Sequence, residues 1–213
     1  MIRTLMAGLV MCAAALSGVA HAADAPAGTS GQAQAADPAA VIKSLQDALI
    51  ATMKDGAKLG FKGRFSRLDP VVTRTHDFAF IARLVLGSDG AKLPVDQQNR
   101  FVKAFTQLGV STYAKEFDSF SGERFEPNQT QNSAAGTVVL STLQIPDHDP
   151  VKFEYQMHQA DGQWKIVNII ADGVSDLALK RTQYRELLRQ KGFDGLMSWV
   201  NQQIQKQAEG SGG

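Results

Sequence analysis

Cysteine is almost missing from this chain of 213 residues, because Cys12 is the single one and it lies in an apolar run near the N-terminus. The chain beyond that run can form no disulfide and offers no thiol nucleophile. A fold built from it must be held together by its buried core alone. The 191 residues after position 22 are enough to bury such a core.

An excess of charge of one sign is missing as well. The chain has 22 Lys plus Arg against 21 Asp plus Glu, and it contains no basic block. Proteins that bind nucleic acid usually carry a basic patch for the phosphate backbone, so we exclude nucleic acid as a partner. Long apolar runs are also missing after residue 22, where none approaches the roughly 20 residues that a membrane span needs.

Common catalytic sequence motifs are missing too. The patterns G-x-S-x-G, H-E-x-x-H, G-x-G-x-x-G and the P-loop do not occur. Outside the first 22 residues there are three histidines. His76 precedes Asp77, which is more simply a helix cap than a partner of the imidazole. His148 lies in a predicted turn, and a loosely held metal is the alternative there. His158 is expected to be exposed. The sequence therefore predicts no catalytic residue, no cofactor and no metal.

The N-terminal segment has the features of a secretory signal peptide. Residues 1–22 contain Arg3, an apolar run and the small-x-small end Ala20-His21-Ala22. Residues 23–37 contain no large apolar side chain and are predicted to form a flexible leader. We expect a single domain over 38–205 and a disordered tail over 206–213. In a double-membraned bacterium the exported product would lie in the periplasm.

Helical spacing of apolar residues dominates the first half of the remaining chain. Asp37-Pro38 is a typical cap followed by a first-turn proline, and it predicts a helix over 38–54. Asp69-Pro70 repeats this pattern and predicts the start of a short helix. Asp77 predicts another that ends at Gly87, and a long helix is expected over 94–118.

The apolar period changes from 3.6 to 2 after Phe120, which predicts strands. Their expected positions are 124–126, 137–145, 151–157 and 163–170, with a hairpin turn at Asp161-Gly162. The strand over 163–170 has apolar groups on both faces, as a central strand would. Helical spacing returns from Val174, and a last helix follows Gly192. The fold class is therefore α+β, with a four-stranded antiparallel sheet and helices packed on one face.

Large apolar side chains gather on one side of the helices and on one face of the predicted sheet. They can interdigitate into an ordinary dry core. Alternatively, the two layers can stand apart and enclose an apolar cavity that holds a lipid. Periodicity does not separate the two interpretations. A tightly filled interior with no void open to solvent would contradict the lipid carrier, unless an unliganded carrier collapses its cavity.

Two long blocks of the sequence resemble one known family. The block His76–Phe117 contains Asp-Phe near a helix start, Arg-x-x-Leu-Gly, a phenylalanine-rich helix and Thr-Tyr-Ala. The block Gly162–Val200 contains a tryptophan strand, the turn Asp-Gly-Val-Ser and a helix with Arg-x-x-Tyr. In order and spacing they are similar to the toluene-tolerance (MlaC) family of periplasmic lipid carriers.

The resemblance implies a non-enzymatic carrier that holds the apolar part of a membrane lipid in an internal cavity and crosses the periplasm with it. The lipid-binding residues that pattern and resemblance together predict come from the helices and the inner face of the sheet. They are Phe78, Phe80, Ile81, Leu84, Phe101, Val102, Phe105, Leu108, Val139, Phe153, Tyr155, Met157, Trp164, Val174, Leu177 and Tyr184.

Two details resemble a single branch of the family, the hopanoid-biosynthesis-associated HpnM branch. They are the stretch Thr112–Glu126 and the form Asp-Leu-Ala-x-x-Arg at residues 176–181. Relatives that carry phospholipids more often have Asn-Tyr-Arg where this chain has Leu179-Lys180-Arg181. The implied cargo is a hopanoid or a phospholipid. The implied partner is an inner-membrane lipid transporter, which for this branch would be the hopanoid-associated RND type.

Two other functions remain open from the residues. An enzyme of the cone-shaped type that resembles nuclear transport factor 2 would need a buried acid with a raised pKa among the aromatic residues. Glu154, a strand acid, is expected to face outward instead. A periplasmic chaperone would expose a broad apolar groove for peptides.

Overall fold

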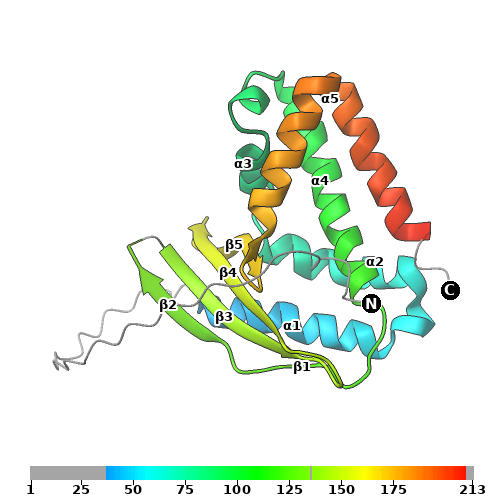
Figure 1. The fold of residues 1–213 in the computed structure, drawn as a ribbon, viewed down its shortest axis with the longest axis vertical. Helices are drawn as coiled ribbons and strands as arrows, with labels where there is room; N and C mark the ends of the chain where they lie inside the picture. The colour runs from blue at the N-terminus through cyan, green and yellow to red at the C-terminus, as the bar shows by residue number, and fades with distance from the viewer. Residues whose placement is uncertain (1–36, 135, 210–213) are drawn as a thin grey trace. The chain divides into compact units, whose positions relative to one another are not determined.

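The computed structural model describes residues 37–134 and 136–209, so the predicted signal peptide and nearly all of the predicted leader lie outside the described residues. The described chain is α+β. Its elements are α1 (Pro38–Lys54), α2 (Gly56–Thr75), α3 (Phe78–Ala91), α4 (Val95–Glu116), β1 (Arg124–Phe125), β2 (Gln129–Ser133), β3 (Gly136–Gln144), β4 (Val151–Ala160), β5 (Gln163–Ala171), β6 (Val174–Ser175) and α5 (Asp176–Glu209). Figure 1 shows their arrangement.

The first helix has the predicted bounds, 38–54. The Asp37 side chain accepts a hydrogen bond from the backbone N–H of Ala39 at 3.1 Å, and Pro38 occupies the first turn, where its missing N–H costs nothing. Ile42, Leu45 and Leu49 are buried on one face of the helix. The cap and the apolar spacing therefore determine this helix together.

The prediction of a short helix that starts at Asp69-Pro70 is wrong. The α2 helix runs through this dipeptide, and Pro70 lies inside it on the exposed side. Proline inside a helix removes one backbone hydrogen bond. Leu68, Val71 and Val72 are buried around it, so their packing offsets that loss.

The next two helices follow the prediction closely. The Asp77 carboxylate accepts a hydrogen bond from the N–H of Phe80 at 2.8 Å, as a helix cap does. Regular helix geometry breaks at Gly87, whose φ is +62°, although a further helical turn extends α3 to Ala91. This left-handed conformation is one that glycine adopts without steric cost. The α4 helix, Val95–Glu116, begins and ends within two residues of the predicted range 94–118.

The sheet has six strands, so the predicted number of four is wrong. The strand order is β1-β3-β4-β5-β6, and β2 pairs with the same edge of β3 as β1. The β2 strand is exposed along its whole length and has no apolar alternation, and β6 has only two residues. The sequences of both strands lack the apolar alternation of period 2 on which the prediction depended.

The strand that the sequence places at the centre, β5, instead lies next to the end of the sheet, between β4 and the two-residue β6. It follows β4 through a two-residue turn in which Asp161 and Gly162 have φ values of +52° and +72°, which is typical of a tight hairpin. Ile166 and Asn168 are both buried, and they pair with Met157 and Gln156 on opposite faces of the sheet. Both faces of β5 are therefore covered.

The prediction that the helices pack on one face of the sheet is wrong. The α1 helix packs along the face from which Val139 and Tyr155 project. The starts of α3 and α5 contact His158 and Asn168, which project from the opposite face. The connection from α2 to α3 also joins the edge of β5, where the N–H of Asp77 donates to the carbonyl of Ile166 at 3.0 Å. The sheet edge therefore fixes where α3 begins.

The last helix bends at Gly192, whose φ is +66°, as the predicted break there requires. It continues to Glu209, four residues past the predicted end of the domain at 205, and residues 210–213 lie outside the described part. Buried apolar side chains from α1 to α5 and from β3 to β5 form one hydrophobic cluster. Among the described residues, no helix combines the length and the apolarity that crossing a bilayer requires.

Candidate functional site

Most of the predicted lipid-binding residues meet in one place. Nine belong to the buried cluster between helices and sheet: Phe78, Ile81, Phe101, Phe105, Leu108, Val139, Tyr155, Met157 and Tyr184. Val102, Phe153, Trp164 and Leu177 are partly buried and pack against it. The remaining three are outside it, because Phe80 and Leu84 are half-buried elsewhere and Val174 is 38% exposed.

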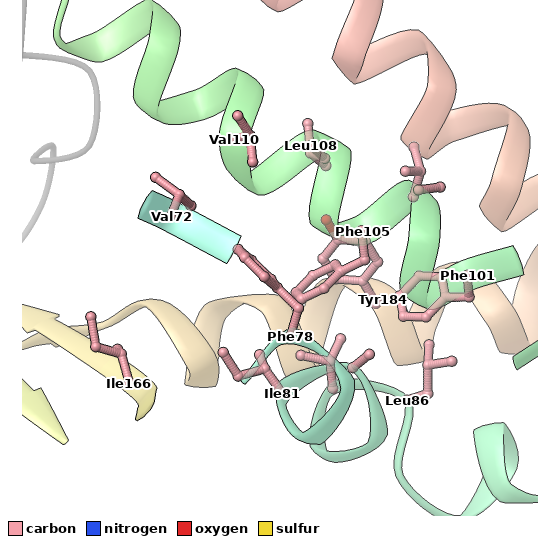
Figure 2. Packing of buried hydrophobic residues seen from close by; sticks show 14 of the residues in the cluster. Val72, Phe78, Ile81, Leu86, Phe101, Phe105, Leu108, Val110, Ile166 and Tyr184 are labelled. Atoms are coloured by element: carbon pink, nitrogen blue, oxygen red, sulfur yellow. The ribbon is translucent and has the colours of Figure 1, made fainter. Parts of the chain in front are cut away.

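Four of these side chains form what we call the aromatic cluster, namely Phe78, Phe101, Phe105 and Tyr184. They come from α3, α4 and α5, and Figure 2 shows them close together. The ring centroids of Phe101 and Phe105 are 5.5 Å apart, and the ring of Tyr184 meets that of Phe105 edge-on at 5.7 Å. Phe78 approaches Phe105 edge-on at 6.1 Å. These are the offset and T-shaped geometries that aromatic pairs prefer.

The inner face of the sheet supplies a second apolar layer. Phe153 and Tyr155 stack along β4 with centroids 5.8 Å apart, and Phe125 of β1 continues the row at 6.5 Å. Val139 pairs with Tyr155 across the neighbouring strands. The sequence correctly predicts this alternation, since Val151, Tyr155 and Met157 are buried whereas Lys152 and Glu154 are exposed.

Polar side chains lie within this second layer, which the sequence analysis missed. Gln46 of α1 donates to the hydroxyl of Ser141 at 2.7 Å and exchanges two hydrogen bonds of 3.0 Å with the amide of Asn128. Tyr155 lies beside Gln46 in this layer, and burial raises the pKa of Tyr155 although the interaction with Gln46 opposes that shift. We call Gln46, Asn128, Ser141 and Tyr155 the polar group. Its members satisfy one another, as buried polar groups must.

The sequence does contain a signal for this polar group. Gln46 lies four residues after Ile42 and therefore on the apolar face of α1. Ser141 lies between Val139 and Leu143 in the inward-facing register of β3. In each case a polar residue occupies an apolar position of the pattern. Such a mismatch marks a buried hydrogen bond or a functional contact.

A second buried polar contact joins α2 to α4. The Nδ1 atom of His76 donates to the carbonyl of Val72 at 2.9 Å, so Nε2 accepts from the Tyr113 hydroxyl at 3.1 Å. Burial lowers the pKa of His76 to about 4, and burial raises the pKa of Tyr113. Both side chains are therefore uncharged at neutral pH. The imidazole stacks on Phe78 at 5.2 Å, which links this contact to the aromatic cluster.

The interior between the layers is filled by side chains in this structure. Phe105 and Tyr155 are each 3% exposed or less, so the predicted cavity is not seen among the described residues. Two hollows lie on the surface. One of about 490 Å³ is lined by α2 and α4 residues, including Asp69 and Lys103, and one of about 290 Å³ lies at the edge of the sheet beside Phe153. The aromatic cluster has the packing of an ordinary core, and the lipid-binding role of its residues remains a prediction.

The groups considered for catalysis or metal binding lie at separate places in the structure. The turn with His148 connects β3 to β4, with Asp147 at a φ of +59°. His158 is less exposed than predicted, because its ring lies 2.9 Å from the Asp77 carboxylate. Burial raises the pKa of Glu116, which is half-buried at the end of α4 and outside the hydrophobic cluster. Within residues 37–209 except 135, no three metal-binding side chains gather.

Comparison with known proteins decides the family. The MlaC protein family matches residues 43–202, which contain α2 to α4, all strands of the sheet and most of α1 and α5. The chain belongs to the MlaC family. A member from Haemophilus influenzae, the intermembrane phospholipid transport system binding protein MlaC, is 22% identical over 123 residues, which are 55% of this chain. That match spans 58% of the relative, less than two thirds of its length.

A solved structure has the fold of this MlaC family member. The phospholipid-binding protein from Ralstonia solanacearum, which was determined in complex with a phospholipid, superposes with a TM-score of 0.71. The alignment covers 81% of this chain and 99% of that one at 22% identity. The likeness establishes the α+β architecture. The HpnM branch within the MlaC family remains a prediction from the sequence.

Proposed function

We propose that the protein is a soluble periplasmic lipid carrier, which shuttles a hopanoid or a phospholipid between the inner and outer membranes. The observation that supports this most is the convergence of thirteen predicted lipid-binding residues on one cluster between helices and sheet. Membership of the MlaC family, and the phospholipid bound by a protein of the same fold, support the same role.

A membrane lipid needs such a carrier because exposing its acyl chains to water costs much free energy. Sheltering one methylene group from water contributes about 0.8 kcal/mol, so an acyl chain of about 15 methylenes needs about 12 kcal/mol of shelter. The aromatic cluster and the inner face of the sheet both belong to the hydrophobic cluster of the described chain. We infer that the cargo enters between them and replaces contacts between rings by equally apolar contacts between rings and the acyl chain. Such an exchange costs little hydration free energy.

The uncharged side chains of the polar group favour a neutral lipid with hydroxyl groups. Gln46, Ser141 and Tyr155 are uncharged, and His76 is neutral at pH 7 because burial lowers its pKa. A phosphate placed beside them would meet no cation of the polar group, whereas a hydroxyl could join its hydrogen bonds. We therefore favour the hopanoid cargo of the HpnM branch, delivered to or from an inner-membrane transporter.

Native mass spectrometry of protein extracted without detergent tests the proposal. We expect a bound hopanoid from a hopanoid-producing host and a bound phospholipid from a host without hopanoids. Protein that is consistently empty in both hosts would contradict it.

Substitution at the half-buried Phe153 tests the location of the cargo. Phe153→Glu places a charge in the apolar layer and should abolish lipid retention while the fold survives, because an unpaired charge beside an acyl chain is costly. Val95→Glu is the matched control, since Val95 is 71% exposed. Unchanged retention in a folded Phe153→Glu variant would place the cargo elsewhere.

A further inference from the structure

We propose that the seam between α3 and α5 is a docking surface for anionic lipid bilayers, an inference that rests on the proposed carrier function. The seam consists of Phe80, Arg83, Leu84, Leu177, Arg181 and Arg185. It contains Phe80 and Leu84, two predicted lipid-binding residues that lie outside the buried cluster.

The two helices run side by side from neighbouring points of the sheet. Asp77, at the start of α3, contacts His158, and the N–H of Leu177 at the start of α5 donates to Asn168. Further along, the guanidinium of Arg185 donates to the carbonyl of Leu84 at 3.2 Å. Figure 1 shows α3 and α5 rising together. Residues four apart on each helix therefore line one seam.

The apolar part of the seam is accessible. Phe80, Leu84 and Leu177 are half-buried, so part of each side chain is open to solvent. Arg83 lies over the ring of Phe80 with its guanidinium carbon 5.7 Å from the centroid. This stacking leaves the N–H edge of the guanidinium free for an oxygen ligand.

The arginines of the seam have no acidic partner among the described residues. Arg83, Arg181 and Arg185 form no ion pair with any described residue, whereas Arg67 and Arg189 pair with Asp55 and Glu186. The buried Nε of Arg185 has no hydrogen-bond partner among the described residues. Residues 176–191 contain five basic and two acidic side chains, a formal charge of +3 in a chain of +1. A lipid phosphate is a bidentate acceptor for exposed guanidinium groups such as those of Arg83 and Arg181.

Half-exposed apolar side chains beneath unpaired arginines suit a bilayer surface. The apolar groups can enter the boundary between headgroups and acyl chains, while the arginines contact phosphates. A carrier that collects or delivers lipid must reach a membrane, so this seam would bring the protein to its cargo. The α5 helix would then join the docking surface to Tyr184 in the aromatic cluster.

Vesicle sedimentation tests the docking surface. The probes are vesicles of phosphatidylcholine with phosphatidylglycerol and vesicles of phosphatidylcholine alone. We expect wild-type protein to bind the anionic vesicles preferentially and to lose binding as salt is added. Each basic residue near an anionic surface contributes about fivefold in affinity, about 1 kcal/mol, so Arg83→Gln with Arg181→Gln should weaken binding about 25-fold.

The control removes the same charge from another surface. Lys58→Gln with Lys62→Gln alters two exposed lysines of α2 and should weaken binding less than about twofold. Equal losses in the two double variants would overturn the proposal. So would a wild-type protein that ignores anionic vesicles at low salt, a result that would assign the seam to a protein partner instead.

Lipid retention by the same variants separates this inference from the carrier function. The arginine double variant should still co-purify with lipid, because both arginines are exposed and outside the buried cluster. Retained cargo together with charge-independent vesicle binding would refute only the docking surface. Empty wild-type protein would refute the carrier function itself.

Discussion

The two apolar layers of this protein are held together by different forces. The aromatic cluster joins α3, α4 and α5 through ring contacts, with centroid separations of 5.5 to 6.1 Å between its members. The polar group joins α1 to the sheet through hydrogen bonds of 2.7 and 3.0 Å. Ring contacts tolerate several offset and T-shaped arrangements, whereas the hydrogen bonds fix one register. The first layer can therefore exchange its partners for an acyl chain, and the second holds α1 in place.

The largest expected effect comes from removing a ring of the aromatic cluster. Phe105→Ala should lower the free energy of unfolding by about 3–5 kcal/mol, because a large side chain with 3% exposure leaves a cavity. Urea denaturation measures the change. Val95→Ala, at a 71% exposed position of the same helix, should change it by less than about 0.5 kcal/mol. A loss below about 1 kcal/mol at Phe105 would mean that the cluster is loosely packed.

Acid should weaken the buried contact of His76 with Tyr113, which lies beside the aromatic cluster. Burial lowers the pKa of His76 from 6.5 to about 4, so the unfolded chain binds a proton that the folded protein does not between these values. The free energy of unfolding should therefore fall by about 3 kcal/mol as the pH falls from 6.5 to 4.

Urea titrations across this pH range check the effect. His76→Gln should remove that part of the pH dependence, while His148→Gln, in an exposed turn, should retain it. An unchanged slope in His76→Gln would show that another group is responsible.

The polar group should respond to loss of one amide. Gln46→Leu leaves the Asn128 amide and the Ser141 hydroxyl without their partner, so we expect a loss of about 1–3 kcal/mol. Adding Asn128→Leu should restore part of that loss, because it removes one of the stranded groups. A double-mutant cycle in urea tests this coupling, and simple additivity would argue against a connected polar group.

The smallest effect should follow from removing a single hydroxyl. Tyr155→Phe keeps the ring stacked on Phe153 but deletes the interaction of the hydroxyl with Gln46, at an expected cost of about 1 kcal/mol. Native mass spectrometry of the same variant sharpens the comparison of the layers. We expect it to lose a hydroxylated lipid more than a phospholipid. Equal loss of both lipids would mean that the hydroxyl does not contact the cargo.

Elements with both a boundary signal and a clear period could be predicted from the sequence. The α1 helix has a cap, a first-turn proline and a regular apolar stripe, and its predicted bounds agree with the structure. The hairpin at Asp161-Gly162 has two positive φ values, which the pair Asp-Gly accepts readily.

The prediction errors occur where a local sequence pattern lies in a different structural environment. Asp69-Pro70 repeats the letters of Asp37-Pro38, but it follows residues that are already helical, with Arg64 and Leu68 buried one turn apart. The β2 strand is stabilised by pairing with β3 along an exposed edge, which leaves no hydrophobic pattern. Context and long-range pairing determine these elements, and neither can be read from a local window.

Prediction of the candidate site has a similar limit. Periodicity correctly identifies the inward residues of β4 and the buried face of α4, but it cannot tell a packed core from a lining that opens. It also passes over Gln46 and Ser141, because it searches for apolar residues and these are polar residues at apolar positions. Their hydrogen bonds join segments 95 residues apart in the chain.

A crystal structure of the protein with its co-purified lipid is the most direct test of this account. We predict that the apolar part of the lipid lies between Phe105 and Tyr155, with α4 and the sheet moved apart and the α1 contact of Gln46 with Asn128 retained. A lipid bound on the outer face of the sheet, with the aromatic cluster packed as in Figure 2, would contradict the account.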